Sequence, residues 1–403
     1  MACTWTSLLA TATASPLWDE GHREALARDL TTLVTVTGHV AEADTLLLPA
    51  GFRRLLTADQ DPLTAAAAGT QAPGAGGGQS GSRDPLALEP KFLASLVRGL
   101  MAGETGATTG GLRVGWVEYA RLTTTAGGGY SNFPEGTPRE VRARYLLYDP
   151  LAAVLTATAR APATVLDVLA PLLPGADPST LGPSRRDTVR RVLATRVDGS
   201  LWEWVSARAQ GSGPACLEAL TAAVASASTL RYRPTAPRTN PYEAQAAWLT
   251  EQATITLAGM DTTTWTPTAR RTTAVMLANS MSDIENTASG IDYAGSNQLF
   301  YLSLSASWSE HHNKELTALL REVLTDDTAL SLLIKALSVF NAYRIVFGIK
   351  ESTESHYHGG IYRSVLSDVQ EGARSYGYLY SACATGRGVG EGEESPAAGV
   401  VLA

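Results

Sequence analysis

The stretch TALSLLIKALSVFNAYRIVF, residues 328–347, places its apolar residues at the spacing of an α-helix. Two further segments, ARRTTAVMLANSM at residues 269–281 and HNKELTALLREVL at residues 312–324, follow the same period. Helical patterns dominate from Pro138 onward. We therefore expect a mainly α fold with minor β (α+β), in one large subunit that carries long surface loops.

Capping residues and prolines mark the starts of several predicted helices. Ser15 followed by Pro16 predicts a helix that runs through HREALARDLTTLV, residues 22–34. Similar signals predict helices that begin near Glu89, Ser184, Pro214 and Asn240. The pair Asp326 and Asp327 could suggest a metal–diphosphate site, but no carboxylate follows three residues later, and two acids at this place favour the start of the next helix.

Two segments are β-branched and predict the minor β component. TTLVTVTGHV, residues 31–40, alternates polar and apolar positions, and LRVGWVEYARLTTT, residues 112–125, has a similar composition. The segment at residues 64–85 consists mostly of small residues and predicts a surface loop. Its stretch GGGQSG, residues 76–81, matches a dinucleotide-binding fingerprint, but no strand precedes it and no helix follows it directly, so we favour a linker.

The predicted domain organisation is simple. Residues 1–385 form one large α-rich domain, with the possibility of two packed lobes whose helix-rich part begins near residue 138. The acidic, glycine-rich residues 386–403 are expected to form a flexible tail.

Composition excludes several classes of protein. The chain has 44% hydrophobic and only 18% charged residues, and four of its 32 basic residues are lysines. A net charge of −7 argues against binding nucleic acid by neutralising phosphates. Three distant cysteines exclude a disulfide framework and fit a reducing intracellular setting. The first residues lack the positive region of a signal peptide, and no window reaches about 18 uninterrupted apolar residues, so we expect no membrane span.

Histidines offer the chain's best candidate metal site. His311, His312, Glu315, His356 and His358 could together bind Zn²⁺ as a cytosolic metal-dependent hydrolase would. However, the order of His312, Lys314 and Glu315 does not follow the His-Glu-x-x-His motif, and no carboxylate is placed as a general base. We therefore favour a solvated helix start and a polar turn, and predict no catalytic residue, no cofactor-binding residue, no metal and no cofactor.

Other motifs are also absent or weak. The chain has no Gly-x-Ser-x-Gly elbow and no Gly-Lys dipeptide of a phosphate-binding loop. RYRPTAPR, residues 231–238, interleaves arginines with an aromatic residue, as single-strand binders do. In an acidic protein we favour a proline-rich connector with exposed arginines. The sequence therefore favours a protein that is not an enzyme.

The overall texture of the chain resembles a family of capsid proteins. The resemblance rests on the abundance of Gly, Ala and Thr, the mainly helical pattern and the acidic tail GEGEESPAAGVVLA at residues 390–403. These features resemble capsid proteins of double-stranded RNA viruses of fungi and protists, of the totivirus or partitivirus kind. The absence of a basic arm agrees with a shell whose duplex genome must slide during transcription.

The resemblance implies a structural protein that self-assembles into an icosahedral viral capsid around a double-stranded RNA genome. Its partners would be copies of itself, as asymmetric dimers in a shell, and the enclosed RNA through weak, sequence-independent contacts, with no membrane. Its location would be the virion and the host cytoplasm. The alternatives are the metal-dependent hydrolase described above and a non-viral helical scaffold protein.

Overall fold

The computed structural model describes residues 2–34, 47–62, 64–65, 86–105, 149–170, 201–211, 213–231, 242–289, 313–354 and 360–388. These residues form fourteen α-helices and one short 3₁₀-helix, and they contain no strand. The mainly α prediction is therefore confirmed. The segment at residues 112–125, predicted to contribute β structure, lies outside the described part of the chain, as does most of the loop predicted at residues 64–85.

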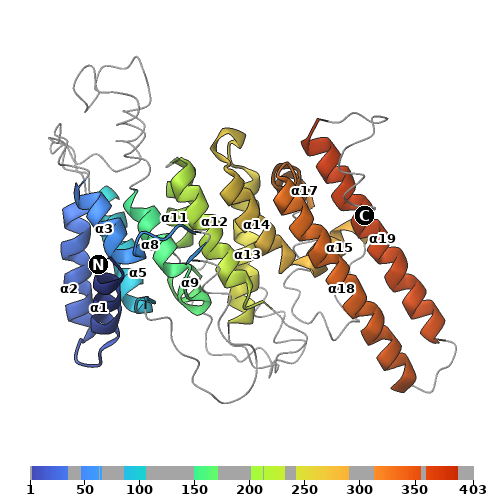
Figure 1. The fold of residues 1–403 in the computed structure, drawn as a ribbon, viewed down its shortest axis with the longest axis horizontal. Coiled ribbons are helices and arrows are strands. Elements are labelled where there is room, and N and C mark those ends of the chain that lie inside the picture. The colour runs from blue at the N-terminus through green and yellow to red at the C-terminus, as the bar shows by residue number, and fades with distance from the viewer. Residues whose placement is uncertain are drawn as a thin grey trace.

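The helices lie side by side along an elongated molecule (Figure 1). At one end are α1 (Ala2–Ala14), α2 (Glu20–Val34), α3 (Leu47–Thr57) and α5 (Pro90–Thr105). The middle contains α8 (Pro150–Thr158), α9 (Pro162–Leu169), α11 (Trp202–Gly211), α12 (Pro214–Ser228) and α13 (Glu243–Ala258). After the 3₁₀-helix η3 (Thr262–Thr264) come α14 (Pro267–Ala278), α15 (Met281–Ser289), α17 (Asn313–Val323), α18 (Asp327–Glu354) and α19 (Gly360–Gly386).

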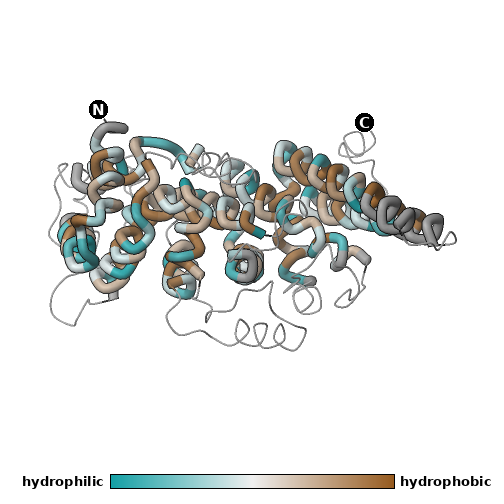
Figure 2. Tube along the Cα trace, turned by 90° about the horizontal axis from the view of Figure 1, so that it is seen from below, coloured by the Kyte–Doolittle hydropathy of each residue, from teal (hydrophilic) through white to brown (hydrophobic). Residues whose placement is uncertain are grey.

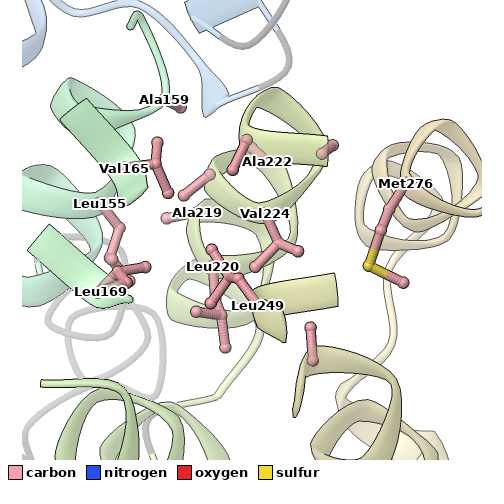
Figure 3. Close-up of a cluster of buried hydrophobic side chains, with 14 of the residues drawn as sticks. Leu155, Ala159, Val165, Leu169, Ala219, Leu220, Ala222, Val224, Leu249 and Met276 are labelled. Carbon is pink, nitrogen blue, oxygen red and sulfur yellow. The ribbon is translucent and has the colours of Figure 1, made fainter. Parts of the chain in front are cut away.

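Helix α12 is the centre of the fold. It packs against α8, α9, α13 and α14, and its residues from Cys216 to Ser228 are buried with the exception of Glu218. Figure 3 shows Ala219, Leu220 and Val224 of this helix among side chains from α8, α9, α13 and α14. The many alanines of α12 leave room for neighbours on several sides, so the helix can be enclosed almost completely.

Several helix starts follow the sequence signals. Helix α12 begins at Pro214 and α18 begins at Asp327, as predicted. The Asp326 side chain accepts a hydrogen bond from the Ala329 backbone N–H (2.9 Å), which is the capping role expected of the acidic pair. Asp149 caps α8 in the same way by accepting from the N–H of Leu151 (2.9 Å).

The prediction for residues 15–40 was wrong in two respects. The helix begins at Glu20 rather than at Pro16, and Asp19 accepts a hydrogen bond from the His22 N–H (2.8 Å) in place of a cap by Ser15. Residues 31–34, expected to start a strand, are the last turn of α2, while residues 35–40 are outside the described ranges. Packing of α2 against α5 overrides the β propensity of these threonines, since Thr31 is buried where Gly99 of α5 approaches it.

At the other end of the molecule, α18 and α19 form a long antiparallel pair that we call the hairpin (Figure 1). One of its sides packs against α14, α15 and α17. Helix α19 ends at Gly386, the residue at which the predicted tail begins, and residues 389–403 are not among those described.

Candidate interaction site

The residues of the predicted metal site are only partly described. Glu315 lies in the first turn of α17, while His311, His312, His356 and His358 fall outside the described ranges. Within those ranges, no group of three or more His, Cys, Asp or Glu side chains is arranged to hold a metal ion. The polar side chains that do converge are arginines and carboxylates, at three buried junctions between helices.

The first junction joins the hairpin to α15 through Arg344. Its guanidinium donates from Nη2 to Asp368 (2.7 Å) and Glu371 (2.6 Å) of α19, and from Nη1 to Glu285 of α15. One cation therefore serves three carboxyl groups, and the side chains of Arg344, Glu285 and Glu371 are almost completely buried. The pKa of Glu285 is raised to about 7, chiefly by burial and also by the neighbouring Glu371 and Asp368, while Arg344 lowers it.

The base of the hairpin is fixed by a second set of contacts. Arg387 donates from Nε (3.2 Å) and Nη2 (3.1 Å) to the carbonyl of Leu324, and from Nη2 to Asp327 (2.6 Å). The hydroxyls of Thr317 and Tyr378 lie 2.7 Å apart and tie α17 to α19. These contacts connect the end of α19 to the turn between α17 and α18.

The second buried junction lies between α12, α13 and α15. Arg231 donates from Nη1 to the hydroxyl of Ser280 (2.6 Å) and from Nη2 to Asp283 (2.6 Å). Burial and the nearby Asp283 raise the pKa of Glu251 on α13 to about 7, although Arg231 lowers it. The prediction of exposed arginines in a proline-rich connector is wrong for Arg231, because this side chain is buried against α15.

The third junction lies in the other half of the molecule. Arg208 of α11 donates to both oxygens of Asp149 (2.9 and 3.0 Å) and to Glu104 of α5 (2.8 Å). Both Arg208 and Asp149 are buried. Since Asp149 also caps α8, this arginine joins α5, α8 and α11 at one point.

The outward side of the hairpin carries exposed apolar residues. The most exposed large ones are Val339 and Val346 of α18 and Leu366 and Val369 of α19, with exposed fractions between 49% and 71%. They belong to a surface that we call the hairpin face, made of Lys335, Val339, Ala342, Val346, Leu366, Val369, Ala373 and Gly377, all exposed. Figure 2 shows apolar and polar segments alternating along the hairpin.

A second exposed apolar group lies near the start of the chain. Trp5 and Leu8 of α1 and Leu17 of the turn before α2 have exposed fractions of 55–89%. Together with the four residues of the hairpin, these are the large apolar side chains that the described residues expose. Figure 1 places α1 and the hairpin at opposite ends of the molecule.

Helix α18 also meets a length and composition criterion for a membrane span. Residues Asp327–Val346 have a mean hydropathy of 1.4, and 28% of this stretch is buried. The same helix contains Lys335 and the ion-paired Arg344 and packs along α19. These features are also those of a helix that packs in a protein and keeps one apolar side exposed.

Sequence reasoning missed the three arginine junctions. Their partners lie far apart in sequence, so no local pattern identifies them, although Asp368 and Glu371 at i and i+3 placed two acids on one side of α19. The hairpin face carried a better signal. Val339, Ala342 and Val346 follow the spacing of three and four residues that marks one side of a helix.

Comparison with known proteins identifies a family for this fold. The sequence model of DUF6571, described as a family of unknown function, matches residues 113–397. No curated protein and no solved structure matches the chain. The matched residues include α8 to α19, and therefore the hairpin, the hairpin face and the junctions at Arg231 and Arg344. Because the match spans more than half of the 403 residues, the chain belongs to the DUF6571 family.

Proposed function

We propose that the protein is a structural protein that acts by associating with copies of itself and has no catalytic role. The observation that carries this proposal is the placement of the exposed large apolar side chains in two groups, on α1 with the following turn and on the hairpin. Exposed apolar groups of this kind mark surfaces that bind other proteins. Two such surfaces at opposite ends allow each copy to contact more than one neighbour.

A closed capsid shell around double-stranded RNA is the specific assembly that the sequence texture suggests, in a virion and the host cytoplasm. The low charge and the shortage of lysine support it, because interfaces between subunits are depleted in lysine and tolerate arginine. The acidic balance supports weak contact with an enclosed duplex rather than tight binding. An open helical scaffold is the broader form of the same proposal.

Sedimentation velocity of the full chain, across protein concentration and salt, tests self-association. We expect species larger than a dimer at micromolar concentration, with a modest dependence on salt because the proposed contacts are mainly apolar. Electron microscopy of the same samples then distinguishes closed particles from open assemblies. A chain that stays monomeric in every condition would overturn the proposal, and open assemblies alone would overturn its capsid form.

A second experiment separates assembly through the two apolar groups from nonspecific aggregation. Trp5→Ser with Leu8→Ser removes the part of one group that lies on α1, and Val339→Ser with Val346→Ser removes the large apolar side chains that α18 contributes to the other. Each pair of changes is expected to reduce the largest species while leaving the melting temperature nearly unchanged, since these side chains are exposed. Assemblies of unchanged size in both variants would contradict the proposed role of these surfaces.

A further inference from the structure

The contacts between α18 and α19 fix which residues lie level with one another in the hairpin. Arg344 pairs with Asp368 and Glu371, and the hydroxyl of Ser338 lies 2.7 Å from that of Tyr376. A Cβ on Gly372 would lie 2.8 Å from the amide nitrogen of Asn341. This register places Val346 level with Leu366, and Val339 level with Ala373.

The exposed residues of the two helices lie on the same side of the hairpin. Arg344 of α18 and Glu371 of α19 both turn toward α15, where Glu285 meets them. Each residue advances about 100° around a helix, so Val339, Ala342 and Val346 lie on the opposite side of α18, and Leu366 and Ala373 on the opposite side of α19. The hairpin face is therefore one continuous surface across both helices.

The spacing within the hairpin face is that of a helix bundle. On α18, Lys335, Val339, Ala342 and Val346 are separated by four, three and four residues, and on α19 Leu366, Val369, Ala373 and Gly377 by three, four and four. Spacings of three and four residues keep side chains on one side of a helix, as in the helices of left-handed bundles. Two helices with this pattern form one half of a four-helix core.

We propose that the hairpin face binds the hairpin face of a second copy of this chain, forming an antiparallel four-helix bundle with two-fold symmetry. The inference deepens the proposed function and rests on it, because it assigns self-association to one surface. In this arrangement each α18 packs against the other α18, and each α19 against the other α19, with the hairpin tips pointing in opposite directions.

Steric complementarity favours a second copy as the occupant. A two-fold axis level with Ala342 and Glu371 sets Leu366 of one copy opposite Gly377 of the other, and Val369 opposite Ala373. Gly377 is open, since a Cβ added there would have no atom within 4 Å. Each larger side chain of α19 therefore meets a small residue, which lets the helices approach closely.

The two-fold axis fixes where the charged residue of the hairpin face lies. Lys335 lies at the base end of the hairpin face and is exposed. Antiparallel hairpins separate the two Lys335 residues by roughly twice their distance from the axis, about 20 Å, but bring each Lys335 level with Lys350 of the other copy, so charge does not decide the direction of the hairpins. Ala342 then lies beside its own counterpart.

The area of the hairpin face agrees with a weak dimer. From Lys335 to Val346 the face is about 17 Å long, and two adjacent helices are about 20 Å wide. This gives an area on the order of 300 Å² per copy, which is less than the area of about 800 Å² per partner that standard interfaces bury. We expect a dissociation constant of tens of micromolar or more.

Substitutions at Gly377 test the proposal without disturbing the fold of one copy. Gly377→Leu fills the space that Leu366 of the other copy would occupy, while Gly377→Ala adds a single methyl group. Both changes raise the helix propensity of an open position, so neither is expected to lower the melting temperature. In sedimentation velocity of the full chain, we expect Gly377→Leu to raise the dimer dissociation constant at least tenfold and Gly377→Ala to change it much less.

Cross-linking tests the geometry directly. In a Cys3→Ser background, Ala342→Cys is expected to give a covalent dimer upon oxidation with copper phenanthroline, because the two residues are adjacent across the axis. Lys91→Cys, at an exposed position of α5, is the control and should give little. Absence of the Ala342→Cys dimer in a chain that still forms large assemblies would overturn the inference and leave the proposed function intact.

The remaining outcomes are also distinguishable. A dimer that cross-links through Ala342→Cys but forms nothing larger would support the inference and overturn the proposed extended assembly. Self-association that is abolished by Trp5→Glu with Leu8→Glu and unaffected by Gly377→Leu would assign the contact to α1 and overturn the inference. Co-sedimentation of the chain with vesicles of phosphatidylserine and phosphatidylcholine, lost in Val346→Glu, would assign the hairpin face to a lipid surface and overturn it as well.

Discussion

Helices α12 and α18 are both apolar, yet one is enclosed and the other exposes a side to solvent. Helix α12 is buried from Cys216 to Ser228 apart from Glu218, and its side chains are mostly small. Helix α18 has larger side chains, but only 28% of its most apolar stretch is buried. The difference shows that the number of neighbours, rather than hydropathy, decides burial here. Helix α12 packs against five helices in the middle of the molecule, namely α8, α9, α11, α13 and α14, whereas α18 lies at one end.

The two regions also differ in how their buried charges are balanced. At the junction of α5, α8 and α11, Arg208 faces two carboxyl groups, Asp149 and Glu104. At the hairpin, Arg344 faces three carboxyl groups, so the excess of negative charge is larger there. Because the pKa of Glu285 is raised to about 7, the hairpin junction should respond to pH near neutrality.

The largest expected effect is the loss of Arg208. Arg208→Met removes the buried partner of Asp149, which also caps α8, and should lower the free energy of unfolding by about 3–5 kcal/mol. Urea denaturation monitored by circular dichroism measures this change in the free energy of unfolding. Arg28→Met, at an exposed position of α2, is the matched control and should cost less than about 0.5 kcal/mol. Equal costs for the two variants would show that the buried arginine is not needed to join α5, α8 and α11.

A somewhat smaller effect is expected at the hairpin. Arg344→Met leaves Glu285, Asp368 and Glu371 without their shared cation. It should lower the free energy of unfolding by about 3 kcal/mol at pH 8. The cost should be smaller at pH 5, where protonation relieves the repulsion among the carboxyl groups. The exposed Arg374→Met in α19 is the control. A cost that is the same at pH 5 and pH 8 would contradict the excess of negative charge at this junction.

The pH dependence of the native protein is a third test. A carboxyl group whose pKa is raised on folding binds more protons in the folded than in the unfolded state, so stability falls as pH rises. For Glu285 the window extends from the ordinary value of 4.5 to about 7, and the full shift corresponds to about 3 kcal/mol. Glu251 has the same window at the Arg231 junction.

We therefore expect the free energy of unfolding to decrease between pH 5 and pH 8. Glu285→Gln should remove about half of this decrease, and Glu251→Gln a similar share, because a neutral amide does not titrate. Urea denaturation at intervals of one pH unit measures both slopes. A stability that rises with pH across this window in the native chain would mean that the arginines outweigh burial at both carboxyl groups.

The smallest effects are expected from two glycines of α19. A Cβ at Gly386 would collide with the backbone carbonyl of Arg321, so Gly386→Ala should cost about 1–2 kcal/mol. Gly377 is in the same helix but open, and Gly377→Ala should stabilise the chain by about 0.5–1 kcal/mol. Thermal denaturation of both variants gives the comparison. Opposite shifts in melting temperature are the expected result, and two decreases would contradict the open position of Gly377.

Much of the helical architecture could be predicted from local patterns. The starts of α12 and α18 followed from Pro214 and from the acidic pair at Asp326 and Asp327, because capping and proline effects act within a few residues. The start of α2 at Glu20 was missed, since Ser15 with Pro16 and Asp19 with Glu20 are competing signals and only packing decides between them.

The candidate site was harder to predict. Arg231 and Arg344 look like surface residues in sequence, and their burial depends on acids that lie 24 to 59 positions away. The exposed side of α18 carried a helical spacing in the sequence, but Leu332, Ile334 and Phe340 make the helix apolar nearly all round, so the pattern did not tell which side is exposed. The position of the helix at the end of the molecule, which no local pattern contains, determines which of these residues face solvent.

The fixed base of the hairpin gives it the mechanics of a lever. Arg387 and Asp327 hold one end of the hairpin, and Arg344 holds α18 to α15 through Glu285. Beyond Arg344, α18 continues for ten residues, about 15 Å, to Glu354. A sideways load on the tip would be transmitted to the ion pairs at Arg344, since each helix is held rigid by its own backbone hydrogen bonds. Force on the tip would thus be felt first at α15, in the interior of the molecule.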